Sequence, residues 1–592
     1  MTEEGRSENG LAAGRFQHGI IGATAGLSLW FCFSELPYFV DSERLLAFLA
    51  AFLMILFSSI LLMTGPLALM RAAAAGAALA LIGAALFLWA SFRFVALDDF
   101  METGHSAVAL GLLSLITLPF LVTAQLPGTD WRDYDRLFDQ AWSMFVRGVI
   151  GAMFSGLFWM ILVASDALLS LVGIIVIATL MEQEWFAAGF SGATFGLALG
   201  VLNEQQRIVS TVRGLALRLL RLLLPVVSVV GAVFVIMLPI RGLDQVFGDL
   251  SAAGTLIAMA MVGISLVAAA VDGTDEAAAA SRVMSGSARL MCVIVPVIAG
   301  LALYALWIRV SDYGWTPERI TGVVAAGTLC GYGLWHIASL ARGGAWRGLI
   351  RTGNTIMALT VIGLSALLLT PVLNPERISA NDQIDRFEAG LSTANELPLW
   401  DLWSNWGTAG SAAWERLETM EGHPQQALLN RLMREAVQDD ATAMPELNAD
   451  MLDLRAVLPS YPEGVQIPDG YIEAIPEYYV TEIHAACGTQ TAAQHVLCAA
   501  IVGDFSDDLE GMEVILVWGG SESGETRFAT LNRTGYGNIH FEAYAGSFGA
   551  PVSSLSAGPV LRDIADGNFA VRQPEFRVLD LGDIQILPPS AR

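Results

Sequence analysis

The chain has 592 residues, of which 54% are hydrophobic and only 15% are charged, against about 25% charged in ordinary soluble domains. Residues 1–373 carry 20 Arg and 24 acidic residues, whereas residues 374–592 carry 12 Arg and 33 acidic residues, so most of the net charge of -25 belongs to the last third. Such an acidic surface repels nucleic-acid phosphates, which excludes most nucleic-acid-binding functions. The composition predicts an apolar, membrane-embedded part followed by an acidic, water-soluble part.

Residues 1–17 precede the first apolar run and are predicted to form a cytoplasmic N-terminal tail. A helix needs about 20 mainly apolar residues to cross the hydrocarbon core, because the core is roughly 30 Å thick. Backbone groups cannot stay unpaired in lipid, so such runs must be helical. Eleven runs between residues 18 and 373 qualify, and their approximate bounds are 18–35, 45–64, 71–91, 105–125, 146–165, 187–203, 222–240, 253–271, 289–309, 319–340 and 353–373.

Just before the fifth run, bulky apolar residues recur at helical spacing and charged residues occupy the opposite face. This pattern predicts an amphipathic helix near residues 131–145 that lies in the membrane plane on the cytoplasmic face. A helix packed against neighbouring spans fits the pattern equally well. The apolar set is Trp131, Tyr134, Leu137, Phe138, Trp142 and Phe145, and the charged set is Asp133, Arg136 and Asp139.

The segment 146–181 is too long for one span and short for two. A carboxylate in mid-bilayer costs roughly 2.5–3.5 kcal/mol, so we expect the span to end near Asp166 and residues 168–181 to follow the interface. This interpretation gives eleven crossings. Asp166 and His336 are the two candidate intramembrane polar groups, and the run of buried acids and arginines that a proton relay requires is missing.

Arginine placement indicates the orientation, because cytoplasmic loops are enriched in basic residues. With the N-terminus inside, 15 of the 20 arginines in the first 373 residues fall in cytoplasmic segments. Eleven crossings then place the C-terminal domain outside the cytoplasm. Arg207, Arg218 and Arg221 share one helical face, a pattern more typical of topology determinants than of a ligand-binding patch. Gly192, Gly196 and Gly200 predict close helix packing, within the chain or between two copies.

Residues 374–592 change from helical to strand-like patterns, which predicts an acidic, extracytoplasmic α+β domain with a small, mostly antiparallel sheet. The predicted helices are 376–390, 409–420, 424–437 and 475–486. The predicted strands are Val496–Val502, Val514–Trp518, Arg527–Leu531, Ile539–Ala543 and Ile584–Leu587.

The C-terminal domain contains only two of the five cysteines, Cys487 and Cys498. In an extracytoplasmic domain such a pair favours a disulfide. A pair of free thiols is one alternative. The other is a zinc site that adds His484 and His495, although three-residue spacing in a strand sends His495 and Cys498 to opposite faces.

Two outer segments share a Pro-Glu-Arg sequence. The first, residues 313–320, contains Trp315, Glu318 and Arg319, and it offers Thr316 as N-cap and Pro317 as first helical residue. The second, residues 374–381, contains Glu376 and Arg377. We expect the segments to lie close together, with Glu318 or Glu376 pairing with Arg377 or Arg319. Two independent helix caps are the alternative.

These motifs, on a scaffold of many spans with a C-terminal soluble domain, resemble an uncharacterised group of bacterial membrane proteins, domain-of-unknown-function family 4153. The resemblance covers most of the span region and implies a polytopic inner-membrane protein with no established activity. It supplies no catalytic residues.

The chain carries no zinc-protease, phosphate-loop or nucleophile-elbow motif. We therefore favour a non-enzymatic envelope protein that positions or senses through its C-terminal domain, with the bilayer as a partner and without a cofactor. The alternatives are a transporter or transporter subunit, which needs a polar path across the membrane, and a membrane transferase acting at the outer face. The sequence identifies no particular protein partner.

Overall fold

In the computed structural model the chain divides into two units, Met1–Ala436 and Val437–Arg592. Each unit has hydrophobic clusters of its own. The structure describes residues 3–40, 42–174, 176–241, 251–279, 281–420, 422–443, 454–462, 465, 467–468, 471–472, 475, 477–489, 495–503, 505, 512–519, 526–532, 535–538, 542–545, 551–552, 557–567, 570–572, 578–580 and 584–587.

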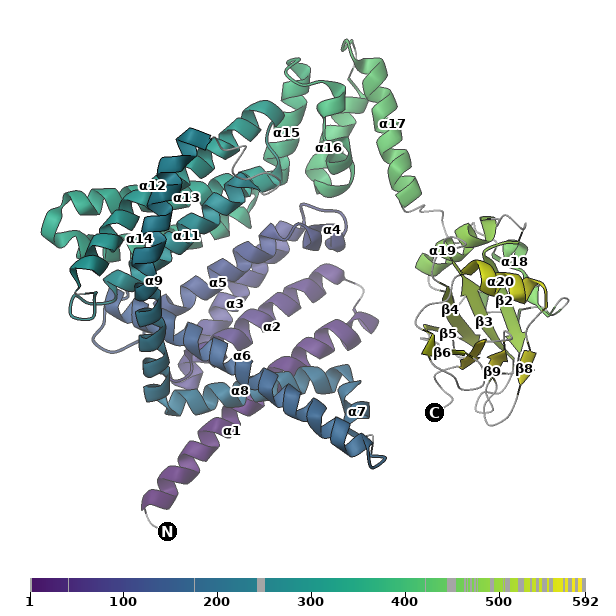
Figure 1. Ribbon diagram of the computed structural model, residues 1–592, viewed down its shortest axis with the longest axis horizontal. Coiled ribbons are helices and arrows are strands. Elements are labelled where there is room, and N and C mark those ends of the chain that lie inside the picture. Colours follow the sequence, from purple (N-terminus) through teal and green to yellow (C-terminus); the bar gives the residue numbers. More distant parts are fainter. Residues whose placement is uncertain are drawn as a thin grey trace. The chain divides into compact units, whose positions relative to one another are not determined.

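Long helices dominate the first unit (Figure 1). Its described helices, long and short, are α1 (Glu3–Trp30), α2 (Glu43–Met63), α3 (Leu69–Ser91), α4 (Leu97–Glu102), α5 (His105–Thr123), α6 (Tyr134–Ser170), α7 (Val176–Met181), α8 (Glu184–Glu204), α9 (Gln206–Arg241), α11 (Ala252–Val271), α12 (Arg282–Tyr313), α13 (Pro317–Ala341), α14 (Trp346–Leu368), α15 (Pro375–Glu388), α16 (Gly407–Glu418) and α17 (Gln426–Ala443), the last of which ends in the second unit. Short 3-10 or π turns lie at Phe31–Glu35, Leu36–Tyr38, Gly343–Ala345, Pro371–Leu373, Ala394–Glu396 and Asp401–Asn405.

Within the described residues, eleven helices are long and apolar enough to cross a membrane, and each overlaps one of the eleven predicted runs. The prediction of a polytopic α-helical bundle followed by an α+β part is therefore confirmed. Helices α9 and α11–α14 share one apolar core, whereas α2, α3, α5 and α6 contribute to another. Most of the core residues are Ala, Leu, Val or Ile, which pack densely between helices.

Helix α1 begins at Glu3, whereas the first candidate span begins at Gly14, so residues 3–13 are helical and precede the span. One predicted boundary is wrong. Helix α6 runs unbroken from Tyr134 to Ser170, so residues near 131–145 do not form a separate in-plane helix. No proline interrupts this 37-residue stretch, and its apolar periodicity continues into the span. Leu137 and Met144 are buried, as in the alternative of a helix packed against its neighbours.

Asp166 lies inside α6, not at its end, because the helix continues to Ser170. The following helix, α7, has only six residues, and at about 1.5 Å per residue it is too short to cross a bilayer. The segment 166–181 therefore adds no twelfth span.

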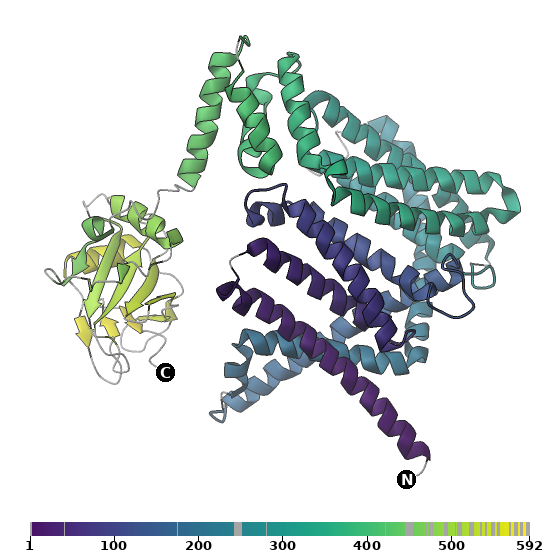
Figure 2. The same ribbon diagram turned by 180° about the vertical axis from the view of Figure 1, so that it is seen from behind.

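Helices α1 and α8 pack against each other (Figures 1 and 2), with glycines at the contact. A Cβ on Gly22 would lie 2.0 Å from the carbonyl oxygen of Gly192, and a Cβ on Gly196 would lie 2.2 Å from that of His18. The two backbones therefore touch, as small residues at four-residue spacing allow. The predicted glycine stripe packs within the chain.

Helices α15 and α16 belong to the first unit, so the predicted domain boundary at residue 374 is wrong. Gln383 of α15 donates to the carbonyl oxygens of Tyr313 and Trp315 at 2.8 and 3.0 Å. Thr408 of α16 donates its N–H and its hydroxyl to the carbonyl oxygen of Arg93 at 2.8 and 2.9 Å. These polar contacts tie a hydrophilic segment to the loops between spans, which hydropathy alone does not reveal.

Over its described residues, the second unit holds two five-stranded sheets, the helices α18, α19 and α20, and the end of α17. The first sheet has the order β1-β2-β3-β4-β5, with β1 parallel to β2 and the remaining pairs antiparallel. The second sheet, β7-β6-β10-β9-β8, is antiparallel. The elements are α18 (Leu454–Val457), β1 (Ser460–Tyr461), α19 (Glu477–Gly488), β2 (Cys498–Gly503), β3 (Glu513–Trp518), β4 (Arg527–Asn532), β5 (Gly535–Asn538), β6 (Glu542–Ala545), β7 (Pro551–Val552), α20 (Ala557–Ala565), β8 (Ala570–Arg572), β9 (Val578–Asp580) and β10 (Ile584–Leu587).

A disulfide joins Cys487 at the end of α19 to Cys498 at the start of β2, with Cα atoms 5.0 Å apart. The bonded sulfurs are not available as thiolate ligands, so the zinc alternative with His484 and His495 is wrong for this structure. Over the described residues, no three His, Cys, Asp or Glu side chains converge as a metal site.

Candidate functional site

A buried carboxylate, Glu376, lies in the first turn of α15. Asn374 caps this helix by accepting a hydrogen bond from the backbone N–H of Arg377 at 3.0 Å, and Pro375 occupies the first helical position. The cap directs Glu376 into the protein, where its side chain is 1% exposed. A buried carboxylate needs partners, because burial of an unpaired charge costs several kcal/mol.

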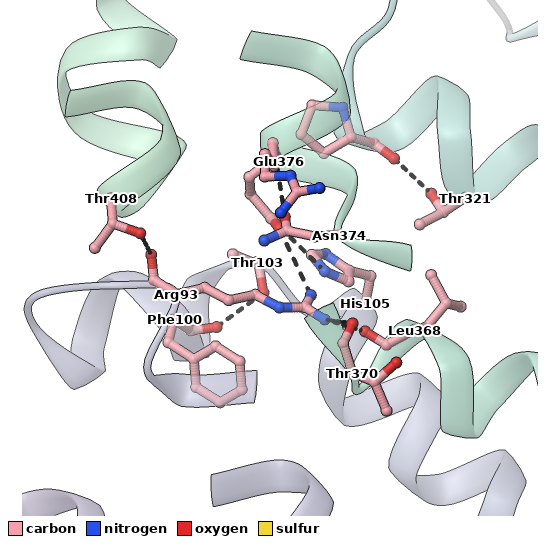
Figure 3. A network of polar contacts seen from close by, with 12 residues as sticks. Arg93, Phe100, Thr103, His105, Thr321, Leu368, Thr370, Asn374, Glu376 and Thr408 are labelled. Carbon is pink, nitrogen blue, oxygen red and sulfur yellow. Dashed lines mark hydrogen bonds and ion pairs between the residues drawn. The ribbon is translucent and has the colours of Figure 1, made fainter. Parts of the chain in front are cut away.

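Two basic side chains from the other half of the span region supply those partners (Figure 3). Arg93, in the loop after α3, places Nη1 3.6 Å from Glu376 Oε2. His105, the first residue of α5, places Nε2 3.2 Å from Glu376 Oε1. Arg93 also donates through Nη2 to the carbonyl oxygens of Leu368 and Thr370 at 2.6 and 2.7 Å. One guanidinium thus joins the end of α3 to the end of α14 and the start of α15.

The electrostatics favour an ionised Glu376. Burial alone raises the pKa of its carboxyl, but His105, the backbone and Arg93 together hold that pKa below its usual value. Burial lowers the pKa of Arg93 while Glu376 raises it, with a net lowering. Because Glu376 is almost fully enclosed, its carboxylate is shielded from solvent. The arrangement fastens α15 to the spans.

Of the predicted outer-face residues, only Glu376 enters this network. Arg319 donates to the carbonyl oxygen of Gly314 at 2.6 Å and stacks on the ring of Tyr313. Glu318 and Arg377 are exposed, and no ion pair joins the two Pro-Glu-Arg segments in the described part of the chain. The predicted pairing is therefore wrong.

The two Pro-Glu-Arg segments nevertheless lie close together, as predicted. The backbone N–H of Trp315 donates to Asp382 of α15 at 2.8 Å. Thr316 caps α13, and Pro317 is its first residue. The sequence contained no signal for Arg93 or His105 beyond their positions at predicted outer ends of spans.

The intramembrane candidates are not brought together. His336 is 1% exposed and packs edge-on against Tyr332, while Asp166 is half-buried in α6. Neither residue lines the two cavities described below. The polar path that a transporter needs is not formed by these two residues.

A second buried arginine lies in α6. Arg147 is 5% exposed and donates to the carbonyl oxygens of Ser143 and Thr64 at 3.2 and 3.3 Å and to Asn203 Oδ1 at 2.7 Å. Asn203 in turn contacts the ring of His18 at 3.1 Å. The three acceptors of Arg147 are neutral oxygen atoms. The sequence does not distinguish Arg147 as a site residue, because an arginine near the end of a predicted span is also typical of a topology determinant.

Two cavities flank α6. One, of about 590 Å³, is lined mainly by apolar side chains of α2, α5 and α6, and Tyr134 and Asn354 add polar groups. The other, of about 330 Å³, is polar and includes Arg147, Arg207 and Arg213. The helix separates the two, since each cavity uses a different face of it.

No curated protein and no solved structure matches the chain. The model of the family described as Domain of unknown function (DUF4153) matches residues 24–397, which is more than half of the sequence. The matched region contains all eleven candidate spans except the start of the first, together with Arg93, His105 and Glu376. The chain therefore belongs to the DUF4153 family.

Proposed function

We propose that this is a non-enzymatic inner-membrane protein of bacterial type that positions or senses through residues 437–592. In this arrangement the N-terminus lies in the cytoplasm and the disulfide-bonded α+β unit lies outside it. The buried network of Arg93, His105 and Glu376 carries the proposal, because it gives the segment leading to the second unit a fixed base on the spans.

The contacts between helix ends support eleven crossings. With alternating spans, the loops near residues 40, 93, 315 and 370 fall on one side, and the loops near 64, 128, 205 and 275 fall on the other. Arg44 donates to the carbonyl oxygen of Phe94 at 2.7 Å, and Arg93 to that of Thr370. On the opposite side, Arg147 reaches Thr64, and Arg351 reaches the carbonyl oxygen of Asp272 at 3.0 Å. Each contact joins a loop or helix end to a loop, or to the first half of a helix, that alternation places on the same side.

The disulfide supports the orientation, since disulfides persist in oxidising compartments and are rare in the cytosol. A topology experiment tests it directly. A reporter that folds only outside the cytoplasm is fused after Arg592 in one version and inserted after Gly344, in the loop before α14, in another. Activity of the C-terminal fusion alone is expected. Activity of the Gly344 insertion alone would reverse the orientation.

Capture of partners tests the positioning function. A photoreactive amino acid replaces Met512, which is 43% exposed on the second unit, and in a matched control it replaces Trp400, 41% exposed on the first unit. Irradiation of cells producing the full chain is expected to give a defined protein adduct at position 512 and a different pattern at 400. Indistinguishable or absent adducts at position 512 would count against a role of this unit in engaging a partner.

A further inference from the structure

The polar cavity beside α6 contains more positive than negative charge. Three arginines line it, Arg147 from α6 and Arg207 and Arg213 from α9, against one carboxylate, Asp139. Asp139 forms an ion pair with Arg213. That pair leaves the charges of Arg147 and Arg207 without a carboxylate among the described residues lining the cavity.

Arg147 is built into this wall. The hydrogen bonds from Nε and Nη1 to Ser143, Thr64 and Asn203 fix the guanidinium. Gly65, with φ +118, lets the loop after α2 approach closely, since a Cβ there would lie 3.2 Å from Arg147 Nη1. Neutral acceptors orient a buried cation but do not cancel its charge, so the site favours an anion.

The first turn of α9 forms another part of the wall. Gln206, Arg207 and Ser210 line the cavity, and Gln206 is the first residue of this 36-residue helix. The helix dipole favours negative charge near a first helical turn, although the N–H of Ile208 already donates to the carbonyl oxygen of Gln205 at 2.9 Å. The backbone and the arginines therefore act in the same direction.

We propose that this cavity binds a phosphoryl group, carried either by the headgroup of an anionic lipid or by a soluble phosphate compound. A volume of about 330 Å³ lies at the small end of the range for ligand sites, roughly 300–1,000 Å³, and suits a headgroup or small phosphate rather than a larger ligand. The cavity is lined by residues at the junction of α8 and α9 and in the loop after α2, which border predicted cytoplasmic loops, so we expect the ligand to belong to that side.

The test uses the purified full-length chain and two probes. Calorimetry with pyrophosphate measures binding of a soluble phosphate. Native mass spectrometry with phosphatidylglycerol, against phosphatidylethanolamine as the zwitterionic reference, measures binding of an anionic lipid. The key variant is Arg207→Gln, because this exposed side chain lines the cavity without holding the fold. The matched control is Arg218→Gln, an exposed arginine farther along α9 that does not line the cavity.

Arg207→Gln is expected to weaken binding of the preferred probe about tenfold, which is the effect of losing one charge-assisted hydrogen bond. Arg147→Gln is expected to abolish it, and Arg218→Gln to leave it unchanged. Binding of pyrophosphate identifies a soluble ligand, and selective retention of phosphatidylglycerol identifies a lipid. The proposal fails if neither probe binds, or if Arg207→Gln and Arg218→Gln weaken binding equally, because a general attraction of basic residues for anions then explains the result.

Discussion

Two buried arginines at opposite ends of the span region differ in their partners. Arg93 and Arg147 are similarly enclosed, 7% and 5% exposed. Both donate to backbone carbonyl oxygens of a distant loop. Arg93 additionally faces the buried carboxylate of Glu376, whereas the hydrogen bonds of Arg147 go only to neutral groups, and its guanidinium lines a cavity.

The difference separates a structural role from a binding role. At Arg93 positive and negative charges meet inside the protein, so little field remains to attract a ligand. At Arg147 the charge is held in place but not neutralised, so an anion entering the cavity meets a prepared cation. Two arginines with similar burial can therefore have different roles. The presence of a counter-ion indicates a structural role, and its absence indicates a binding role.

The largest effect is expected from breaking the charged network. Glu376→Gln leaves Arg93 buried without a carboxylate, and loss of one partner of a buried pair costs about 3–5 kcal/mol. The free energy of unfolding of the full-length protein in detergent, followed by denaturant titration, measures this loss.

Arg377→Gln is the matched control for that measurement. It changes the next residue of the same helix turn, which is exposed, and its expected effect lies within about 0.5 kcal/mol. Equal losses from Glu376→Gln and Arg377→Gln would show that the buried network does not fasten α15.

A smaller loss is expected at the other arginine. Arg147→Gln removes hydrogen bonds to neutral acceptors and leaves no charge behind, so we expect a loss of about 2 kcal/mol in the same titration. A loss as large as that of Glu376→Gln would mean that Arg147 also has a charged partner. The proposed difference between Arg93 and Arg147 would then be wrong.

The spans and most C-terminal elements are predictable because their signals are local. Apolar runs of about 20 residues specify membrane helices wherever they occur, and all eleven are present. The strands Cys498–Gly503 and Glu513–Trp518 follow from short apolar runs between turn residues. Helix ends were harder to place. The prediction of an in-plane helix near residues 131–145 is wrong, because an amphipathic pattern is equally typical of a helix packed against its neighbours.

The partners of buried charges could not be predicted, since they depend on tertiary structure. Glu376 and Arg93 are 283 residues apart in the chain, and neither lies in a motif that names the other. The similarity between the two Pro-Glu-Arg segments favours Arg319 as a partner of Glu376. In the structure Arg319 instead donates to the carbonyl oxygen of Gly314, which lies just before its own helix. Arg147 was equally hidden, because one arginine near the end of a span has the same local sequence whether it fixes topology or lines a cavity.

Gly65 offers a more selective way to disturb Arg147. Its φ is +118, and a Cβ would lie 2.7 Å from Asn203 Oδ1. Gly65→Ala therefore combines backbone strain with overcrowding of the network. Gly128→Ala is the control, because φ is +76 there and nothing lies within 4 Å. We expect Gly65→Ala to cost about 1 kcal/mol more than Gly128→Ala, measured as the difference in unfolding free energy. Equal costs would mean that the Arg147 network tolerates the extra methyl group.

The smallest expected effect is a change of stability with pH. It distinguishes the Arg93–Glu376 network from the Arg147 network, because only the first contains a carboxylate. The folded-state pKa of Glu376 lies below its usual value of 4.5, so its contribution to stability is complete above that value and disappears as the pH falls through the folded pKa. The stability difference between wild type and Glu376→Gln should therefore shrink on acidification below pH 4.5. The difference between wild type and Arg147→Gln should stay constant over the same range, because no carboxylate partner of Arg147 is protonated. Unfolding titrations between roughly pH 7 and pH 3 measure both differences. If the Glu376→Gln difference also stays constant, Glu376 is already protonated when buried, and Arg93 is as free of a counter-ion as Arg147.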